Sequence, residues 1–304
     1  MDHQSFTNLA DVSLTLTSRV SSTETNKNNN LVISPLSLHA ILSVIAAGSS
    51  GSTHEQLLTF LKANSSDELN QLCAELVSLV FADGSAVADE VVLDVNSWAK
   101  TKTNGLISDL LDPDSVDCNT NLIFANAIYF KGAWKRKFNA SQTKEDDFYL
   151  LNGNSTKVPF MTNEYDQFIK VFICFTILRL PYKQGQDKRQ FSMYLFLPDE
   201  KYGLPALMQK LSSEPGFLHN HLPLLVKRIP IAKLKIPKFK FSFGFEASNV
   251  LKGLGVELPF KAGGLTEMID SSSSAIARKL YVSDIFQKSF IEINEEGTKA
   301  AAAS

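Results

Sequence analysis

The sequence predicts an α+β fold, with helices in the first third of the chain and strands in most of the remainder. Three observations predict it. Apolar residues recur at helix-face spacing up to about residue 80, a nearly continuous apolar run spans Leu122 to Phe130, and the segment from Lys238 to Phe243 alternates strictly between polar and aromatic residues. No internal repeat and no linker divides the chain, so we expect one domain over residues 1–304.

The first predicted helix carries its apolar face from Leu9 to Val20. A second helix is predicted to begin at Ser34 and Pro35, because serine is a preferred N-cap and proline is tolerated at the first helical position. Gly48 is expected to end this helix.

A third helix is predicted after Ser52, because Ser52 and Glu55 have the spacing of a capping box. The serines and glycines around residue 50 lack the lysine of a phosphate-binding loop, so we do not expect phosphate binding there. A fourth helical stripe runs from Leu69 to Val80.

The predicted strands begin beyond about residue 117. The run from Leu122 to Phe130 is typical of a strand that is buried on both faces, and its Asn126 then needs buried hydrogen-bond partners. A second strand is predicted from Phe191 to Leu197. Lysines interleaved with aromatics between Lys238 and Phe243 could bind nucleic acid, but a half-buried strand explains the alternation with fewer assumptions.

The charge balance excludes general binding to nucleic acid or to an anionic membrane. The chain has 30 basic and 32 acidic residues and a net charge of −2, without a basic cluster. The most apolar window, from Phe168 to Leu180, is shorter than the roughly 20 residues of a membrane helix. The N-terminus lacks a secretory signal, which favours a cytoplasmic or nuclear location.

Motifs for catalysis, cofactors and metals are not found. The three cysteines form no C-x-x-C pair, so we expect buried or inert thiols and neither a disulfide scaffold nor a zinc site. His219 and His221 could both face one metal ion, but no third ligand is suggested nearby. We therefore expect a protein that is not an enzyme and that carries no cofactor and no metal.

Several segments resemble one family, the serpins, and its plant branch in particular. The matching stretches follow the family's order along nearly the whole chain: Leu31–His39, Leu122–Phe138, Leu180–Gly185, Phe191–Asp199, Lys235–Leu254, Leu265–Met268 and Ile291–Ser304. The last, IEINEEGTKAAAAS, looks like the hinge of an inhibitory reactive loop. The resemblance implies a serpin fold of N-terminal helices and large, mostly antiparallel sheets, and a serine or cysteine endopeptidase as partner. Although the sequence favours the cytoplasm or nucleus, many members of this family act outside cells.

In the mechanism that the resemblance implies, a protease cleaves the loop, which then enters the main sheet as an extra strand. The implied hinge comprises Glu295, Glu296, Gly297, Thr298, Lys299, Ala300, Ala301, Ala302, Ala303 and Ser304. Strand alternation places Thr298, Ala300, Ala302 and Ser304 on one face, where small side chains avoid overpacking. Lys299 stands where the family usually has glutamate, and on an outward face we expect this reversal to be nearly neutral. The alternative is an ordinary strand ending near Asn294, followed by a flexible alanine tail.

The resemblance also implies two polar sites. A cluster beneath the opening sheet would comprise Ser34, Ser37, Asn126 and Gln287, the last standing where the family usually has histidine. At the top of the sheet, Lys238 and Glu295 match an ion pair of the family, with Trp134 close by.

The sequence departs from the family in three places. It ends at Ser304, inside the hinge, so that the scissile bond, the rest of the loop and the closing strands are absent from it. The stretch between Phe81 and Val91 is shorter than in the family, and Ile173–Phe175 is apolar where polar residues are usual.

We therefore expect an incomplete serpin fold. It belongs to a homologue of serine-type endopeptidase inhibitors that does not itself inhibit by trapping. The alternatives are a non-inhibitory interaction protein, which accepts a partner's strand at an open sheet edge, and a degenerate gene product.

Overall fold

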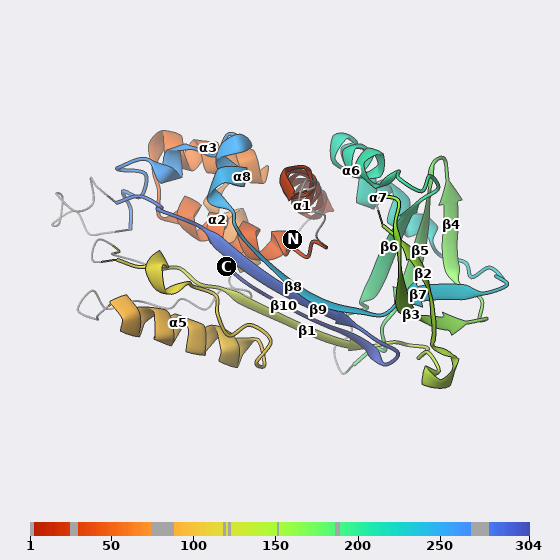
Figure 1. The fold of residues 1–304 in the computed structure, drawn as a ribbon. Coiled ribbons are helices and arrows are strands. Elements are labelled where there is room, and N and C mark those ends of the chain that lie inside the picture. The colour runs from red at the N-terminus through yellow and green to blue at the C-terminus, as the bar shows by residue number, and fades with distance from the viewer. Residues whose placement is uncertain are drawn as a thin grey trace.

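A computed structural model describes residues 3–24, 30–73, 88–117, 120, 123–150, 152–185, 189–268 and 280–304. A long four-stranded antiparallel sheet runs diagonally through the molecule, and the N-terminal helices lie on one of its faces (Figure 1). Two three-stranded sheets lie at one end of this long sheet (Figure 1). The arrangement is the mixed helix and antiparallel-sheet fold that the sequence predicts.

The N-terminal helices are α1 (His3–Glu24), α2 (Pro35–Ala47), α3 (Gly51–Leu61) and α4 (Ser66–Cys73). The start of α2 is as predicted, because the Ser34 hydroxyl oxygen accepts the Ser37 amide at 3.3 Å and Pro35 occupies the first turn. Gly48 is its C-cap, also as predicted.

The prediction of Ser52 as the cap of α3 is wrong. Ser50 occupies the N-cap position, and Gly51 adopts a φ of +55°, a left-handed conformation that glycine reaches readily. The chain therefore enters the helix ahead of Ser52. The stripe predicted from Leu69 to Val80 is helical as far as Cys73, and residues 74–80 lie outside the described part of the chain.

The long sheet contains β1 (Ala127–Ala133), β8 (Phe239–Glu246), β9 (Phe286–Ile293) and β10 (Gly297–Ala303), in the spatial order β1-β10-β9-β8. Strand β8 alternates half-buried phenylalanines with exposed residues, as the pattern predicts. Of the strand predicted from Leu122 to Phe130, Leu122 lies outside the described residues, and the observed strand begins at Ala127, although Asn126 still exchanges backbone hydrogen bonds with Ser304.

The two smaller sheets are made of β2 (Lys144–Tyr149), β3 (Ser155–Asn163) and β7 (Leu234–Pro237), and of β4 (Phe168–Phe172), β5 (Phe175–Pro181) and β6 (Ser192–Pro198). The remaining helices are α5 (Ala88–Lys102), α6 (Leu204–Ser213), α7 (Phe217–His221) and α8 (Ser248–Gly253). Short 3-10 turns are η2 (Pro113–Ser115), η3 (Ala140–Gln142), η4 (Leu222–Leu224) and η5 (Leu258–Phe260).

The apolar window from Phe168 to Leu180 forms the β4–β5 hairpin. None of the helices in the described ranges is long and apolar enough to cross a membrane. Cys174 lies exposed at the tip of this hairpin with a φ of +73°, so of the expected buried or inert thiols this one is not buried, because a tight turn holds it away from any core. Cys118 falls outside the described residues.

The long sheet has a core on each face. One face packs on α1, α2 and α8, and the other packs on α5 (Figure 1). Strand β10 lies inside this sandwich, so it is enclosed by neighbours in the sheet and by layers above and below it.

Candidate functional site

The alanine-rich segment forms β10, an interior strand of the long sheet. It runs antiparallel to both neighbours, with Ala300 opposite Phe130 of β1 and Ile291 of β9. A flexible alanine tail would show no such pairing. Since both edges of β10 are paired, the segment fills the whole space between β1 and β9.

The face of β10 that carries Lys299 is mostly buried. Ala301 and Ala303 are 5% and 0% exposed and pack in one cluster with Val95 and Ala99 of α5. Only the Lys299 side chain, at 43%, is substantially exposed. The expectation of an outward face is therefore wrong for the two alanines, because a helix from elsewhere in the sequence covers them.

The lower end of β10 enters a buried polar cluster. The Ser37 hydroxyl donates to Asn126 Oδ1 at 2.6 Å and shares a hydrogen bond with the Ser304 hydroxyl at 2.8 Å. The side-chain Nδ2 of Asn126 donates to the Ser37 carbonyl oxygen at 2.9 Å. Asn126 thus has partners on α2, as a buried amide requires.

Gln287 joins the same cluster from β9. Its Nε2 donates to the Ser34 carbonyl oxygen at 2.8 Å and to the Ser304 hydroxyl at 3.2 Å. Its Oε1 accepts the Ser34 amide at 3.1 Å. The glutamine, only 2% exposed, is thereby hydrogen-bonded to both backbone groups of the residue that precedes α2, and it is the partner of the Ser34 amide.

The structure therefore brings together Ser34, Ser37, Asn126 and Gln287 and adds Ser304 to them. Sequence reasoning placed Ser304 in the hinge but not in this cluster. Its hydroxyl was the available signal, because strand alternation puts Ser304 on the face of Thr298 and Ala302.

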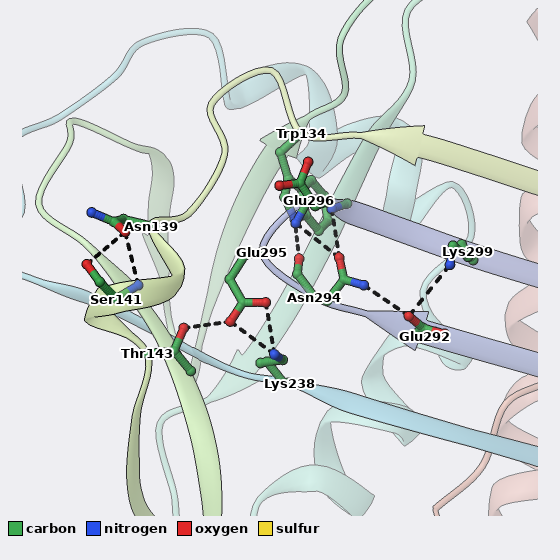
Figure 2. A network of polar contacts seen from close by, with 11 residues as sticks. Trp134, Asn139, Ser141, Thr143, Lys238, Glu292, Asn294, Glu295, Glu296 and Lys299 are labelled. Carbon is green, nitrogen blue, oxygen red and sulfur yellow. Dashed lines mark hydrogen bonds and ion pairs between the residues drawn. The ribbon is translucent and has the colours of Figure 1, made fainter.

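At the upper end of β10, Glu295 lies between two donors. Lys238 Nζ is 2.9 Å from its carboxylate, and the Thr143 hydroxyl donates to it at 2.7 Å (Figure 2). The Glu295 side chain is 12% exposed and that of Lys238 is 34% exposed. Burial raises the pKa of Glu295, but the hydrogen bonds from Lys238 and Thr143 outweigh it and the pKa falls below its ordinary value.

Trp134 lies beside the turn between β9 and β10 and donates two hydrogen bonds to it. Its indole Nε1 donates to the Asn294 carbonyl oxygen at 2.8 Å, and its backbone amide donates to the Glu296 carbonyl oxygen at 2.9 Å. The indole stacks on the Tyr182 ring with centroids 4.8 Å apart. Tyr182 in turn donates to the Thr298 hydroxyl at 2.8 Å, so one aromatic pair contacts both the turn and the first residues of β10.

Sequence reasoning missed Asn294 and Thr143. Asn294 Oδ1 accepts the amides of Glu296 and Gly297 at 3.0 and 3.3 Å (Figure 2). An asparagine directly before a glycine-containing turn was a usable signal, whereas nothing in the sequence around Thr143 points to Glu295. No group of metal-ligating side chains occurs in the part of the chain that the structure describes.

A comparison with models of protein families matches most of the chain. The family model described as "Serpin (serine protease inhibitor)" matches residues 7–88 and 82–304. The two matches overlap at residues 82–88, and residues 74–87 lie outside the described structure.

Similar proteins include plant serpins. Serpin-ZX of Arabidopsis thaliana is 47% identical over 337 residues, covering 96% of this chain and 85% of the relative. Serpin-ZXA of Oryza sativa subsp. japonica is 44% identical over 320 residues, covering 90% and 80%. The structure of Arabidopsis AtSerpin1 in its native stressed conformation superposes with a TM-score of 0.88 at 44% identity, covering 98% of this chain and 86% of that one. The chain therefore belongs to the serpin family, the serine protease inhibitors, and is of the plant type.

Proposed function

We propose that this protein is a serine endopeptidase inhibitor homologue whose hinge occupies the strand position that trapping requires, so that the polypeptide of residues 1–304 does not trap a protease. The family's activity is inhibition and not catalysis. The single observation that carries the proposal is the position of β10, which is paired with β1 on one side and with β9 on the other.

Trapping by insertion needs a sheet that can still accept a strand. In this chain the position between β1 and β9 is filled by Gly297–Ala303. Releasing β10 would unpair its backbone on two sides and would expose Ala301 and Ala303 to water. A second strand therefore cannot enter without a large loss of hydrogen bonds and packing.

The experiment is to incubate the polypeptide with trypsin-like, chymotrypsin-like and papain-like proteases and to separate the products in SDS. We expect free protease and no SDS-resistant band, while an inhibitory serpin run in parallel gives one. A covalent complex with any of the three proteases would contradict the proposal.

A second candidate function, acceptance of a strand from a protein partner, is favoured by the outer edge of β1. Asn126 and Ser304 exchange both backbone hydrogen bonds, so the amides of Tyr129 and Lys131 point away from β10. The Ala133 end of this edge is covered, because Lys183 donates to the Ala133 carbonyl oxygen and Trp134 forms a bridge with Tyr182. Along residues 127–131 no strand in the described ranges pairs with it. Unpaired edges of this kind accept strands.

The test of this candidate compares two proline variants. Lys131→Pro removes an outward amide and leaves the β1–β10 ladder intact, whereas Phe130→Pro removes an amide that faces β10. A stoichiometric partner captured by the wild type and lost in Lys131→Pro, with the thermal midpoint nearly unchanged, supports strand acceptance. A partner that Lys131→Pro still retains would show that binding does not use this edge.

A further inference from the structure

The turn that joins β9 to β10 does not have the backbone angles that are usual in a tight hairpin. Glu295 and Glu296 form a two-residue loop. It is closed by the backbone N–H of Asn294, which donates to the Gly297 carbonyl oxygen at 3.0 Å. Two-residue hairpin loops favour turn types with positive φ angles. Neither glutamate has a positive φ. Something other than backbone preference must hold this turn.

The Asn294 side chain supplies the missing constraint. Its Oδ1 accepts the Gly297 amide, a hydrogen bond that a backbone carbonyl makes in a regular hairpin, and it also accepts the Glu296 amide. Because the side chain replaces the carbonyl, the Asn294 carbonyl oxygen is free to accept the indole of Trp134. The turn is thus anchored to its own backbone and to the aromatic side chain beside it (Figure 2).

The other end of the carboxamide is oriented by Glu292. Asn294 Nδ2 donates to Glu292 Oε1 at 3.0 Å, which assigns the oxygen of the amide to the turn (Figure 2). Glu292 lies directly opposite Lys240 of β8 and Lys299 of β10, each 3.9 Å from its carboxylate. Its side chain, 20% exposed, therefore connects the turn to three adjacent strands.

We propose that Asn294 is the positioning residue of the hinge: its carboxamide, oriented by Glu292, fixes the turn that keeps β10 in register between β1 and β9. The inference rests on the proposed function, since it concerns the strand whose insertion that function invokes. It also gives Lys299 a role. A glutamate at this position would lie directly opposite Glu292, and the two carboxylates would repel each other, so the choice of lysine affects the stability of this sheet.

The test measures hydrogen exchange of the β10 amides, with the amides of the β5–β6 pair as an internal control. In Asn294→Ala the turn loses its acceptor, and we expect exchange in β10 to be about tenfold faster, as for loss of a capping asparagine. The β5–β6 amides should not change. Glu292→Gln is the matched control, because its side-chain oxygen can still accept from Asn294 Nδ2, and we expect less than about a threefold effect.

A pair of substitutions that exchanges the amide and the carboxylate between positions 294 and 292 tests whether Asn294 acts through this hydrogen bond or only through packing. Asn294→Asp alone faces two carboxylates toward each other and should loosen β10, although less than the alanine variant does, because an aspartate oxygen still accepts from the turn amides. Combining Asn294→Asp with Glu292→Gln lets the glutamine amide donate to the aspartate, and we expect protection to return to within about threefold of the wild type.

The possible failures are distinguishable. Wild-type β10 amides that exchange as freely as an unfolded chain would overturn the proposed function and the inference together. Protected wild-type amides with unchanged exchange in Asn294→Ala would overturn the role of Asn294 alone. Failure of the double variant to regain protection of the β10 amides would also overturn that role. This measurement is informative even if Asn294→Ala does not fold.

Discussion

Gly297 lies so close to Gly132 that a Cβ added to Gly297 would stand 1.9 Å from the Gly132 carbonyl oxygen. The obstacle is backbone, which cannot swing aside as a flexible side chain can. At this point β10 enters the sheet, where Gly297 pairs with Ala133 and Thr298 pairs with Gly132. The first residue of the inserted strand therefore has to be glycine.

The first prediction concerns this contact. Gly297→Ala should lower the free energy of unfolding by about 1–3 kcal/mol, because a methyl group is forced against a carbonyl oxygen in a packed sheet. Urea denaturation measures the loss. Gly185→Ala is the control, since a Cβ there meets nothing within 4 Å. Equal stability of the two variants would show that Gly297 does not lie against β1.

The buried cluster at the lower end of β10 gives the second prediction. Gln287→Leu leaves the Ser34 amide without its partner, while the Ser34 carbonyl oxygen keeps the helix amides of Ser37 and Leu38, so we expect a cost of about 1–3 kcal/mol of unfolding free energy. Gln287→His should cost less, because an imidazole can keep part of these contacts. If the leucine variant melts at the wild-type temperature, the cluster is not formed in solution.

The third prediction follows from the lowered pKa of Glu295. A carboxyl with a lower pKa in the folded state stabilises the fold above its unfolded pKa, and this contribution is lost as the pH falls through the folded pKa. The hydrogen bonds from Lys238 and Thr143 outweigh the opposing effect of burial, so Glu295 stabilises the fold at neutral pH. In Glu295→Gln this part of the acid-induced loss, below about pH 4.5, should disappear.

Unfolding free energies of the two proteins, measured from pH 7 downward, test this expectation. The exposed carboxyl of Glu145 provides the control variant Glu145→Gln, which should follow the wild-type curve. A Glu295→Gln curve that runs parallel to the wild type at every pH would contradict the assigned ion pair.

The fourth prediction concerns His39, a buried histidine of α2 whose Nδ1 has no hydrogen-bond partner. Burial lowers its pKa from 6.5 to about 4. Between these values the unfolded chain binds the proton more readily, so stability should fall by about 2 kcal/mol from pH 7 to pH 5. His39→Leu should remove this slope, as denaturant titrations at the two pH values will show. An unchanged slope would place the acid sensitivity elsewhere.

The parts of the fold that depend on local chemistry were predictable from the sequence. The serine and proline at the start of α2 determine its first turn through a cap and a fixed φ, and the alternation in β8 determines its buried face. Both effects act within a few residues, so a single sequence suffices to read them.

The parts that depend on distant segments were not predictable from local patterns. The burial of Ala301 and Ala303 requires α5, which lies about 200 residues earlier in the sequence. The residues of the lower cluster came from the family resemblance, while Ser304 and the turn residue Asn294 appeared only once β10 was placed in register. Hydrogen bonds across a sheet depend on register, which composition and periodicity do not specify for a run of alanines.

The register of β10 against β1 is the central claim, and a cross-strand disulfide tests it most directly. Lys131 and Lys299 face each other in a non-hydrogen-bonded pair, where Cα atoms are about 4.5 Å apart and within disulfide range. Their replacement by cysteines is made in a background in which serine replaces Cys73, Cys118 and Cys174. The Lys131→Cys/Lys299→Cys variant should form the disulfide nearly completely on mild oxidation, as mass spectrometry of the linked peptides will show. The Lys131→Cys/Ala300→Cys variant should not, because its side chains point to opposite faces. Equal cross-linking of the two variants, or none in the first, would contradict the insertion of the hinge between β1 and β9.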